Sequence, residues 1–279
     1  MEIKAATIAH WPLLQAFYQG VYKAGHPLQN IAFWQWQFGN PAYGKAFIAI
    51  ENGEIAGHLG VSLSGGYAWH ICLYVLPQYR NGTVLLSLIN AAGHLGKQGN
   101  INANADAIKL YRLLGWYQYT SLIRMTCINP AMQHKNIDEL ITPITLPGNT
   151  GEKPEGHYWQ QPTLQGCVLA DGSLGVLQPL VGAVRFAILC NPKKALQQAW
   201  DMGFNWADYI TSFNNPLLLK LEKAGWQTDT ESNIPWRLNP VIKNSASNIS
   251  FLTKEPIPID FYINRTHSDI GRVGSIPPI

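Results

Sequence analysis

The stretch that decides the fold reads Leu73-Tyr-Val-Leu-Pro-Gln-Tyr-Arg-Asn-Gly-Thr-Val-Leu-Leu-Ser-Leu-Ile89. An apolar run ends at Pro77, a short polar turn carries Arg80 and Gly82, and a second apolar run begins at Val84. This order predicts a strand, a turn and the start of a helix. In that geometry the backbone N–H groups of the first helical turn point outward and can hold a phosphate.

A second motif follows downstream, at Asn104-Ala-Asp-Ala-Ile-Lys-Leu-Tyr-Arg-Leu-Leu-Gly-Trp116. We expect a helix that stops at Gly115, because glycine often ends helices, and then a long strand over residues 116–127. A short strand is expected just before this helix, over residues 101–104. The two motifs therefore belong to one alternating run of strands and helices.

Upstream of the first motif, the sequence predicts a mixed fold. Residues 2–7 alternate like a strand, residues 8–25 show helical spacing, and residues 30–39 form an aromatic-rich helix. Asn52-Gly53 is a strong signal for a two-residue hairpin between strands, and a further strand is expected over residues 67–75. The expected fold class is α+β, with a mostly antiparallel central sheet flanked by helices.

The second half of the chain repeats part of the first. Asn214-Asn-Pro-Leu-Leu-Leu-Lys-Leu-Glu-Lys-Ala-Gly-Trp226 has the internal spacing of the second motif, with Leu221 at the place of Tyr111. Each copy precedes a strand-like stretch that ends in Asn-Pro, at Asn129 and at Asn239. Repetition of this kind is a signal about the fold. We expect tandem domains at residues 1–132 and 156–279, joined by a linker over 133–155.

Composition narrows the class of protein. The 279 residues are 47% hydrophobic and 13% charged, which indicates a globular chain, and the formal charge is +3. No Lys/Arg cluster resembles a nucleic-acid site, and no segment resembles a signal peptide or a membrane span. The expectation is a cytoplasmic protein without nucleic-acid or membrane partners. The four cysteines are widely separated, so neither disulfides nor a metal site is expected.

Together the two motifs resemble those of the GNAT acetyltransferase superfamily. The first is similar to the acyl-CoA motif of that family, V-x-P-x-x-R-G-x-G-x-G/A, and the second is similar to its motif N-x-x-A-x-x-x-Y-x-x-x-G-F/W. The resemblance covers about residues 1–130. One departure is that only Gly82 remains where the family usually has alternating glycines, so the turn is less permissive for a close backbone approach. The second half looks like a degenerate copy that contributes to the acceptor site or serves as a scaffold.

The resemblance implies how acyl-CoA would be held. The strand backbone would pair with the pantetheine arm, and the turn with the first helical residues would hold the pyrophosphate at the positive end of the helix dipole. The side chain of Asn104 would reach the cofactor arm or cap its own helix. The implied cofactor-binding residues are Leu73, Val75, Arg80, Asn81, Gly82, Thr83, Val84 and Asn104.

Two residues are candidates for catalysis. Tyr111 stands where many members of the family place the acid that protonates the leaving thiolate, although it also suits an ordinary buried aromatic position. His70 is the candidate base for the acceptor amine, because a histidine titrates near neutrality. Strand alternation would put His70, Cys72 and Tyr74 on one face. His58 on the neighbouring strand is a second choice.

The sequence thus predicts an acyl-CoA-dependent N-acyltransferase, with acetyl-CoA as the expected donor. The acceptor would be a primary amine on a small molecule, attacking directly in a ternary complex. An amino sugar, free or linked to a nucleotide, is one candidate. Two alternatives stay open. One is transfer of an aminoacyl or long acyl group, and the other is a binding or sensing module without catalysis. The oligomeric state is not predicted.

Overall fold

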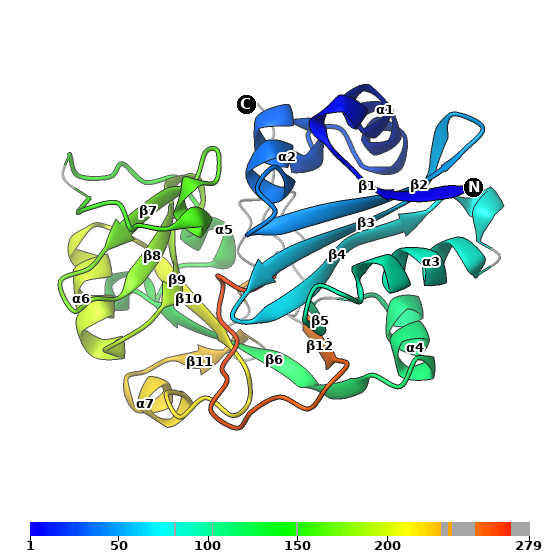
Figure 1. Ribbon diagram of the computed structural model, residues 1–279. Coiled ribbons are helices and arrows are strands. Elements are labelled where there is room, and N and C mark those ends of the chain that lie inside the picture. The colour runs from blue at the N-terminus through cyan, green and yellow to red at the C-terminus, as the bar shows by residue number, and fades with distance from the viewer. Residues whose placement is uncertain (81, 102, 149, 230–233, 236–248, 269–279) are drawn as a thin grey trace. The chain divides into compact units, whose positions relative to one another are not determined.

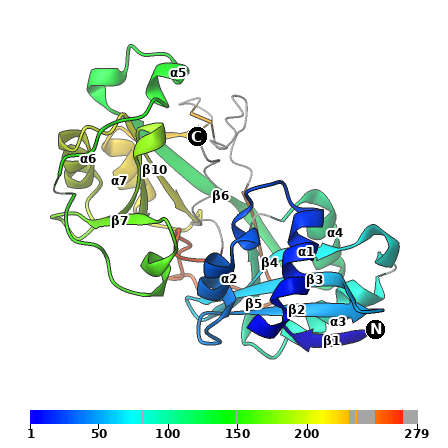
Figure 2. The same cartoon turned by 90° about the horizontal axis from the view of Figure 1, so that it is seen from above.

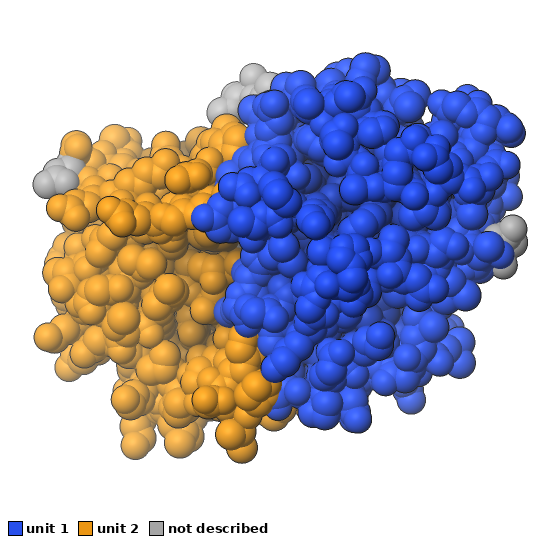
Figure 3. All heavy atoms as spheres, in the orientation of Figure 1, with its two compact units in different colours: residues 1–119, 250–257, 267–279 blue, residues 120–249, 258–266 orange. Residues whose placement is uncertain are grey.

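The computed structural model describes every residue except 81, 102, 149, 230–233, 236–248 and 269–279. The chain folds into two compact units, coloured in Figure 3. Unit 1 comprises Met1–Tyr119, Ser250–Ile257 and His267–Ile279. Unit 2 comprises Thr120–Ile249 and Pro258–Thr266. The late segments of the chain are therefore shared between the two units.

The centre of unit 1 is a sheet in which the strands follow the order β1-β2-β3-β4-β5-β12. Neighbouring strands run antiparallel except β4 and β5, which are parallel. The strands are β1 (Glu2–Ala5), β2 (Gly44–Glu51), β3 (Glu54–Ser64), β4 (Tyr67–Val75), β5 (Lys97–Ile101) and β12 (Ile249–Thr253). The expected strand over residues 67–75 is confirmed.

Helices cover both faces of this sheet. In Figures 1 and 2, α1 and α2 lie over one face, and α3 and α4 lie over the other. A buried apolar cluster joins α3 and α4 to the strands beneath them. The helices are α1 (Trp11–Val21), α2 (Ile31–Phe38), α3 (Thr83–Ala92) and α4 (Ala105–Leu113), with short 3-10 turns η1 (Ile8–His10), η2 (Pro27–Gln29) and η3 (Pro77–Tyr79).

Local sequence explains several of these elements. Asn52 and Gly53 adopt φ values of 51° and 81°, which the tight β2–β3 hairpin requires and which Asn and Gly tolerate best. Asn30 caps α2 by accepting hydrogen bonds from the backbone N–H groups of Ala32 and Phe33. The expected fold class, a mostly antiparallel sheet flanked by helices, is confirmed.

Unit 2 contains a second sheet, ordered β6-β10-β9-β8-β7, with β11 also paired to β6. Only β9 and β10 run parallel in it. Its elements are β6 (Tyr117–Ile128), η4 (Pro130–Met132), α5 (Ile137–Leu140), η5 (His157–Gln160), β7 (Gln165–Val168), β8 (Leu174–Gln178), η6 (Pro179–Val181), β9 (Ala183–Ile188), α6 (Pro192–Asp201), β10 (Trp206–Thr211), α7 (Leu218–Lys223) and β11 (Gln227–Thr228). From β7 to α7 the order of strands and helices matches that from β2 to α4.

The repeated Gly-Trp segments have the same local conformation in both units. Gly115 and Gly225 have φ values of 80° and 88°. After them, the backbone N–H of Trp116 donates to the backbone carbonyl of Tyr111 over 3.0 Å, and that of Trp226 donates to the backbone carbonyl of Leu221 over 3.1 Å. In each case a buried tryptophan closes the end of a helix. The expected end of the second copy, at Asn239, lies outside the described residues.

The division into units differs from the contiguous domains expected at residues 1–132 and 156–279. Strand β12 pairs with β5, opposite residues 99–101, so a late segment of the chain completes the sheet of unit 1. Most of β6 belongs to unit 2. Strand β5 also begins at Lys97 rather than at residue 101, because α3 ends at Ala92. Long-range strand pairing leaves no local signal, which is why the sequence did not indicate these boundaries.

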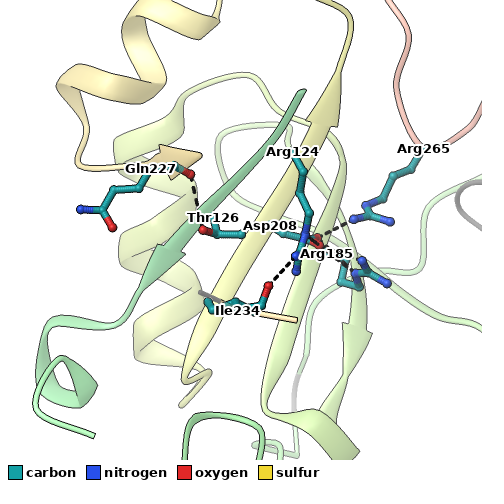
Figure 4. A network of polar contacts seen from close by, with 7 residues as sticks. All are labelled: Arg124, Thr126, Arg185, Asp208, Gln227, Ile234 and Arg265. Carbon is teal, nitrogen blue, oxygen red and sulfur yellow. Dashed lines mark hydrogen bonds and ion pairs between the residues drawn. The ribbon is translucent and has the colours of Figure 1, made fainter. Parts of the chain in front are cut away.

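A buried ionic cluster holds unit 2 together (Figure 4). Asp208 on β10 is fully buried and meets three guanidinium groups. Arg124 donates from Nε over 3.0 Å, Arg185 from Nη2 over 2.8 Å and Arg265 from Nη2 over 2.7 Å. Arg124 also donates to the carbonyl of Ile234 over 2.9 Å. Burial alone would raise the pKa of Asp208, but the three positive charges lower it below its ordinary value.

We expect Asp208→Asn to destabilise unit 2 strongly. The substitution leaves buried guanidinium groups without their carboxylate, and breaking a buried ion pair in this way costs about 3–5 kcal/mol. Urea unfolding followed by tryptophan fluorescence measures the change. Asp201→Asn, on the exposed end of α6, is the matched control and should shift the midpoint little. Equal midpoints for the two variants would contradict the stabilising role of the cluster.

Candidate active site

Strand β4 carries a bulge at Cys72. In the register with β3, Ile71 lies opposite Gly60 and Tyr74 lies opposite His58. Three steps along β4 thus match two steps along β3, and Cys72 has a φ of 50°. One extra residue in a strand bends it and re-aims its backbone groups. The bulge therefore interrupts the hydrogen-bond ladder immediately before the motif that begins at Leu73.

Beyond the bulge, β4 also parts from β5. The parallel register joins residues 67–70 of β4 to residues 97–100 of β5, and it ends with His70 opposite Asn100. Strand β4 continues to Val75, whereas β5 ends at Ile101. In the described register, Leu73 and Val75 therefore have no partner on β5. The side of β4 that faces β5 is therefore open to an extended ligand here, at the place that the resemblance implied.

His70 and Tyr111 meet beside the point where β4 and β5 part. The Tyr111 hydroxyl lies 3.0 Å from His70 Nδ1, and His70 Nε2 lies 2.7 Å from Gln98 Oε1. Because that amide oxygen only accepts, Nε2 carries the proton and Nδ1 accepts one from Tyr111. Asn100 Nδ2 donates to the His70 carbonyl over 2.8 Å. The structure thus brings together two residues that the sequence analysis had selected for separate reasons.

Both side chains are held in their neutral forms. The pKa of His70 is lowered to about 4, mainly by burial; the hydrogen bond to Gln98 opposes this and the charge of Lys254 adds to it. Burial also raises the pKa of Tyr111 above its ordinary value, opposed by a hydrogen bond from Asn100. Since His70 is fully buried and both of its ring nitrogens are engaged, the structure does not support it as the base for an acceptor amine. It orients Tyr111 instead.

The expectation that His70, Cys72 and Tyr74 share one face is wrong. His70 contacts Tyr111 on the α4 side, whereas the Tyr74 ring packs against Phe17 of α1, with centroids 6.1 Å apart. The extra residue of the bulge reverses the alternation after Cys72. Tyr74 consequently faces the α1 and α2 side of the sheet.

His58 supports the bulge from the α1 and α2 side. Its Nδ1 lies 3.0 Å from the Cys72 carbonyl oxygen, and its Nε2 lies 2.9 Å from the Tyr18 hydroxyl. Trp34 Nε1 donates to the same hydroxyl over 3.2 Å. His58 is fully buried and both of its nitrogens are engaged, so it is not placed as an exposed base either. Sequence reasoning missed its partners, because Tyr18 and His58 are 40 residues apart.

Arg80 lies at the end of β4, in the turn before α3. Its Nε donates to the Val75 carbonyl over 2.9 Å, and its guanidinium lies 5.2 Å from the centre of the Tyr74 ring. The side chain is exposed. It therefore places a full positive charge next to the unpaired stretch of β4.

Helix α3 begins as the turn motif predicts. Gly82 takes a φ of 87°, which favours glycine, and it precedes Thr83 at the first helical position. A Cβ added at Gly82 would meet nothing within 4 Å, so the backbone angle rather than crowding accounts for the glycine. No side chain of the described residues caps this helix. Val84 is buried under it, and Asn81 lies outside the described residues.

Asn104 caps α4. Its Oδ1 accepts a hydrogen bond of 2.9 Å from the backbone N–H of Ala107, and the side chain is exposed. The capping role that the sequence indicated is confirmed. A contact of Asn104 with a cofactor stays a prediction.

These features coincide with a family assignment. Residues 9–116 match the model of the Acetyltransferase (GNAT) family. This segment is a GNAT acetyltransferase domain. No curated protein matches the chain in sequence. The expected resemblance is thereby confirmed for the segment that contains β4, the turn, α3 and α4.

Solved structures extend the comparison to the fold of the whole chain. A structure of a proposed acetyltransferase from Pyrococcus horikoshii covers 99% of this chain and 92% of its own, with 10% identity and a TM-score of 0.54. An aminoglycoside 6′-N-acetyltransferase from Acinetobacter haemolyticus covers 43% and 92%, with 19% identity and a TM-score of 0.36. A ribosomal-protein-alanine N-acetyltransferase from Brucella melitensis covers 44% and 88%, with 20% identity and a TM-score of 0.34. Because the identity is only 10%, the similarity to the Pyrococcus horikoshii structure shows the fold alone.

Two further observations concern metal sites and membrane-spanning helices among the described residues. Within the described part of the chain, no group of three or more His, Cys, Asp or Glu side chains is arranged to hold a metal ion. No helix among the described residues has the length and apolar character needed to cross a bilayer.

We expect the buried His70 to make stability depend on pH between about 6.5 and 4. In this window the unfolded chain protonates the histidine and the folded chain does not, so the free energy of unfolding falls as the pH is lowered. The full effect is on the order of 3 kcal/mol, from about 1.4 kcal/mol per pKa unit. Urea unfolding at a series of pH values measures it. His70→Gln should flatten the dependence, whereas His134→Gln, at an exposed position, should not. An unchanged slope in His70→Gln would refute this origin.

Proposed function

We propose that this GNAT domain transfers an acetyl group from acetyl-CoA to a primary amine of a small molecule, by direct attack in a ternary complex. The observation that carries the proposal is the parting of β4 and β5 at a bulge, with the Tyr111 hydroxyl beside it. An extended ligand arm can add on the side of Leu73 and Val75 that has no partner on β5, as peptides add to open sheet edges.

The turn after β4 supports binding of the pyrophosphate. The amides at the start of α3, including those of Thr83 and Val84, lie at the positive end of the helix dipole. Arg80 adds a full charge at the same end of β4, and it is exposed to an incoming anion. Gly82 supplies a positive φ directly before the helix, and no side-chain hydrogen bond among the described residues caps its first turn.

The equivalent place in unit 2 is built differently. Helix α6 begins with Pro192 and is capped by Asn191, whose Oδ1 accepts from the backbone N–H of Lys194 over 3.1 Å. A capped first turn has fewer donors for a phosphate. Leu221 also takes the place of Tyr111. We therefore propose that unit 2 is a degenerate copy of the fold and that catalysis occurs once per chain.

Tyr111 suits the role of general acid. The amine nitrogen attacks the thioester carbonyl carbon, a C–N bond forms, and the C–S bond breaks. The departing thiolate takes the proton of the Tyr111 hydroxyl, and the proton lost by the amine nitrogen restores the phenol, so protons balance over the reaction. His70 holds the hydroxyl in place through Nδ1. A thiolate is a weaker base than tyrosinate, so this transfer depends on the proton that the attacking nitrogen returns to the phenol.

The charge pattern of the domain bears on the acceptor. No Asp or Glu occurs between Ile3 and Ile50, or between Ile55 and Ala105. Acceptors with several ammonium groups need carboxylates to pair with, and these stretches offer none. We therefore propose an acceptor with one reacting amine that is otherwise neutral or anionic. An amino sugar, alone or linked to a nucleotide, has that chemistry.

A sensing module without catalysis is the second candidate. The full burial of Tyr111, with its hydroxyl bonded to His70, is the observation that favours it. In this alternative the parting of β4 and β5 would still bind acyl-CoA, but no amine would be acetylated.

We expect acetyl-CoA to raise the stability of the protein. A ligand at 100 times its dissociation constant adds about 2.7 kcal/mol when it binds only the folded state. Arg80→Gln should weaken binding by roughly tenfold, equivalent to about 1.4 kcal/mol. Lys193→Gln, on the exposed surface of α6, removes the same charge and should leave binding unchanged. Calorimetry with acetyl-CoA measures both. Absence of heat and of any thermal shift in the unaltered protein would end the proposal.

We expect Tyr111→Phe to lower kcat by about 10²-fold, the lower end of the contribution of a general acid, with little change in KM for acetyl-CoA. Tyr117→Phe, at an exposed position, is the control. Thiol release measured over a panel of amines also tests the acceptor. Nucleotide-linked and simple amino sugars should react faster than an aminoglycoside. Faster acetylation of the polycation would overturn the acceptor class, and acetyl-CoA binding without acetylation of any amine would favour the sensing module.

A further inference from the structure

The backbone at the bulge of β4 is held from one side by a chain of hydrogen bonds. The Cys72 carbonyl only accepts, so His58 Nδ1 carries the proton that it receives over 3.0 Å. His58 Nε2 must then accept, and Tyr18 donates its hydroxyl proton to it over 2.9 Å. Trp34 Nε1 donates in turn to the Tyr18 oxygen over 3.2 Å. Every donor in the chain points toward Cys72.

The side chains that form this series of hydrogen bonds are buried. Trp34, Tyr18 and His58 each expose 1% of their surface or less. Away from water, hydrogen bonds that share a direction polarise and strengthen one another. The Cys72 carbonyl is therefore fixed toward His58, on the face of the sheet that α1 and α2 cover.

Fixing one carbonyl also fixes the next amide. The C=O of Cys72 and the N–H of Leu73 belong to one planar peptide unit, and in the trans form they point in opposite directions. With the carbonyl turned to His58, the Leu73 N–H points away from His58. Leu73 has no counterpart in the described registers with β3 and β5. The amide is therefore aimed outside the sheet ladder, at the place where β4 and β5 part.

We propose that His58 is a positioning residue, which fixes the Cys72–Leu73 peptide so that the Leu73 N–H donates to the thioester carbonyl oxygen of the acyl donor. This inference rests on the proposed function. Attack of the amine moves negative charge onto that oxygen. A preorganised amide stabilises the charge without reorganisation, and loss of one such donor lowers kcat by about 10²–10³-fold.

The backbone conformation at Cys72 indicates that the hydrogen bonds to the bulge have a specific role. A positive φ at a residue other than glycine costs about 1–2 kcal/mol and persists only where its surroundings impose it. A regular β4 would avoid that cost. The structure instead uses three buried polar side chains to stabilise the bulge, where apolar residues would suffice for packing alone.

The test is the infrared spectrum of acetyl-CoA, labelled with carbon-13 at the carbonyl, bound to the full chain. In the unaltered protein the carbonyl stretch should shift to lower frequency relative to free acetyl-CoA. His58→Leu removes the donor to Cys72 and should lose most of that shift, whereas His58→Asn keeps an N–H near Nδ1 and should retain it. Binding of CoA without an acyl group should be the same in all three proteins, because it makes no carbonyl contact. Once an acceptor amine is identified, kcat should fall in His58→Leu, while KM for acetyl-CoA should change little.

Each outcome either supports or contradicts the positioning role of His58. A folded His58→Leu variant with the unaltered carbonyl frequency would overturn the positioning role. If urea unfolding shows that His58→Leu does not fold, His58→Met, which is also unable to donate, takes its place beside His58→Asn. No binding of acetyl-CoA to the unaltered protein refutes the proposed function and this inference together. Binding without any shift of the carbonyl band refutes this inference alone.

Discussion

The structure of unit 1 depends on an interruption in strand pairing. Strands β4 and β5 pair in parallel only as far as His70 and Asn100, and the bulge at Cys72 interrupts the ladder with β3 before it resumes at Tyr74. Unpaired backbone is costly where water cannot reach it, so such an interruption persists only where the surroundings stabilise it. Here two buried histidines do so from opposite faces. His70 orients Tyr111 on one side, and His58 holds the Cys72 carbonyl on the other.

The two units meet similar constraints with different chemistry. In unit 1 the polar residues next to the parallel pair are neutral and are linked by single hydrogen bonds, as between His70 and Gln98. In unit 2 the parallel pair β9 and β10 carries Arg185 and Asp208, which sit directly opposite each other in the register and belong to a buried ionic cluster. Full charges on both β9 and β10 make this place in unit 2 unsuitable for binding a thioester. This difference is the reason for proposing that catalysis is confined to unit 1.

Much of the fold of unit 1 follows from local sequence. The Asn52-Gly53 hairpin, the extent of β4 and the glycine that ends α4 all rest on residue preferences that act within a few positions. Tyr111 was also found from its motif. The bulge could not be predicted, because Cys72 has no sequence feature that favours a positive φ. The contacts of His58 with Tyr18, and of His70 with Tyr111, join residues about 40 positions apart that only the folded sheet brings together. The near-neutral pKa of free histidine suggested His70 as a base, whereas its burial in the folded sheet lowers that pKa.

The return of β12 to the first sheet has a consequence for biosynthesis. Strand β5 obtains its second neighbour only from residues 251–253, so the sheet of unit 1 stays incomplete while the ribosome synthesises the intervening 149 residues of unit 2 and its flanks, counted from 102 to 250. During that time β5 is an edge strand, a position at which other chains can pair. A nascent or prematurely terminated chain that includes the whole GNAT segment would therefore still lack one strand of its own sheet. Synthesis of residues 251–253 is what gives β5 its second neighbour.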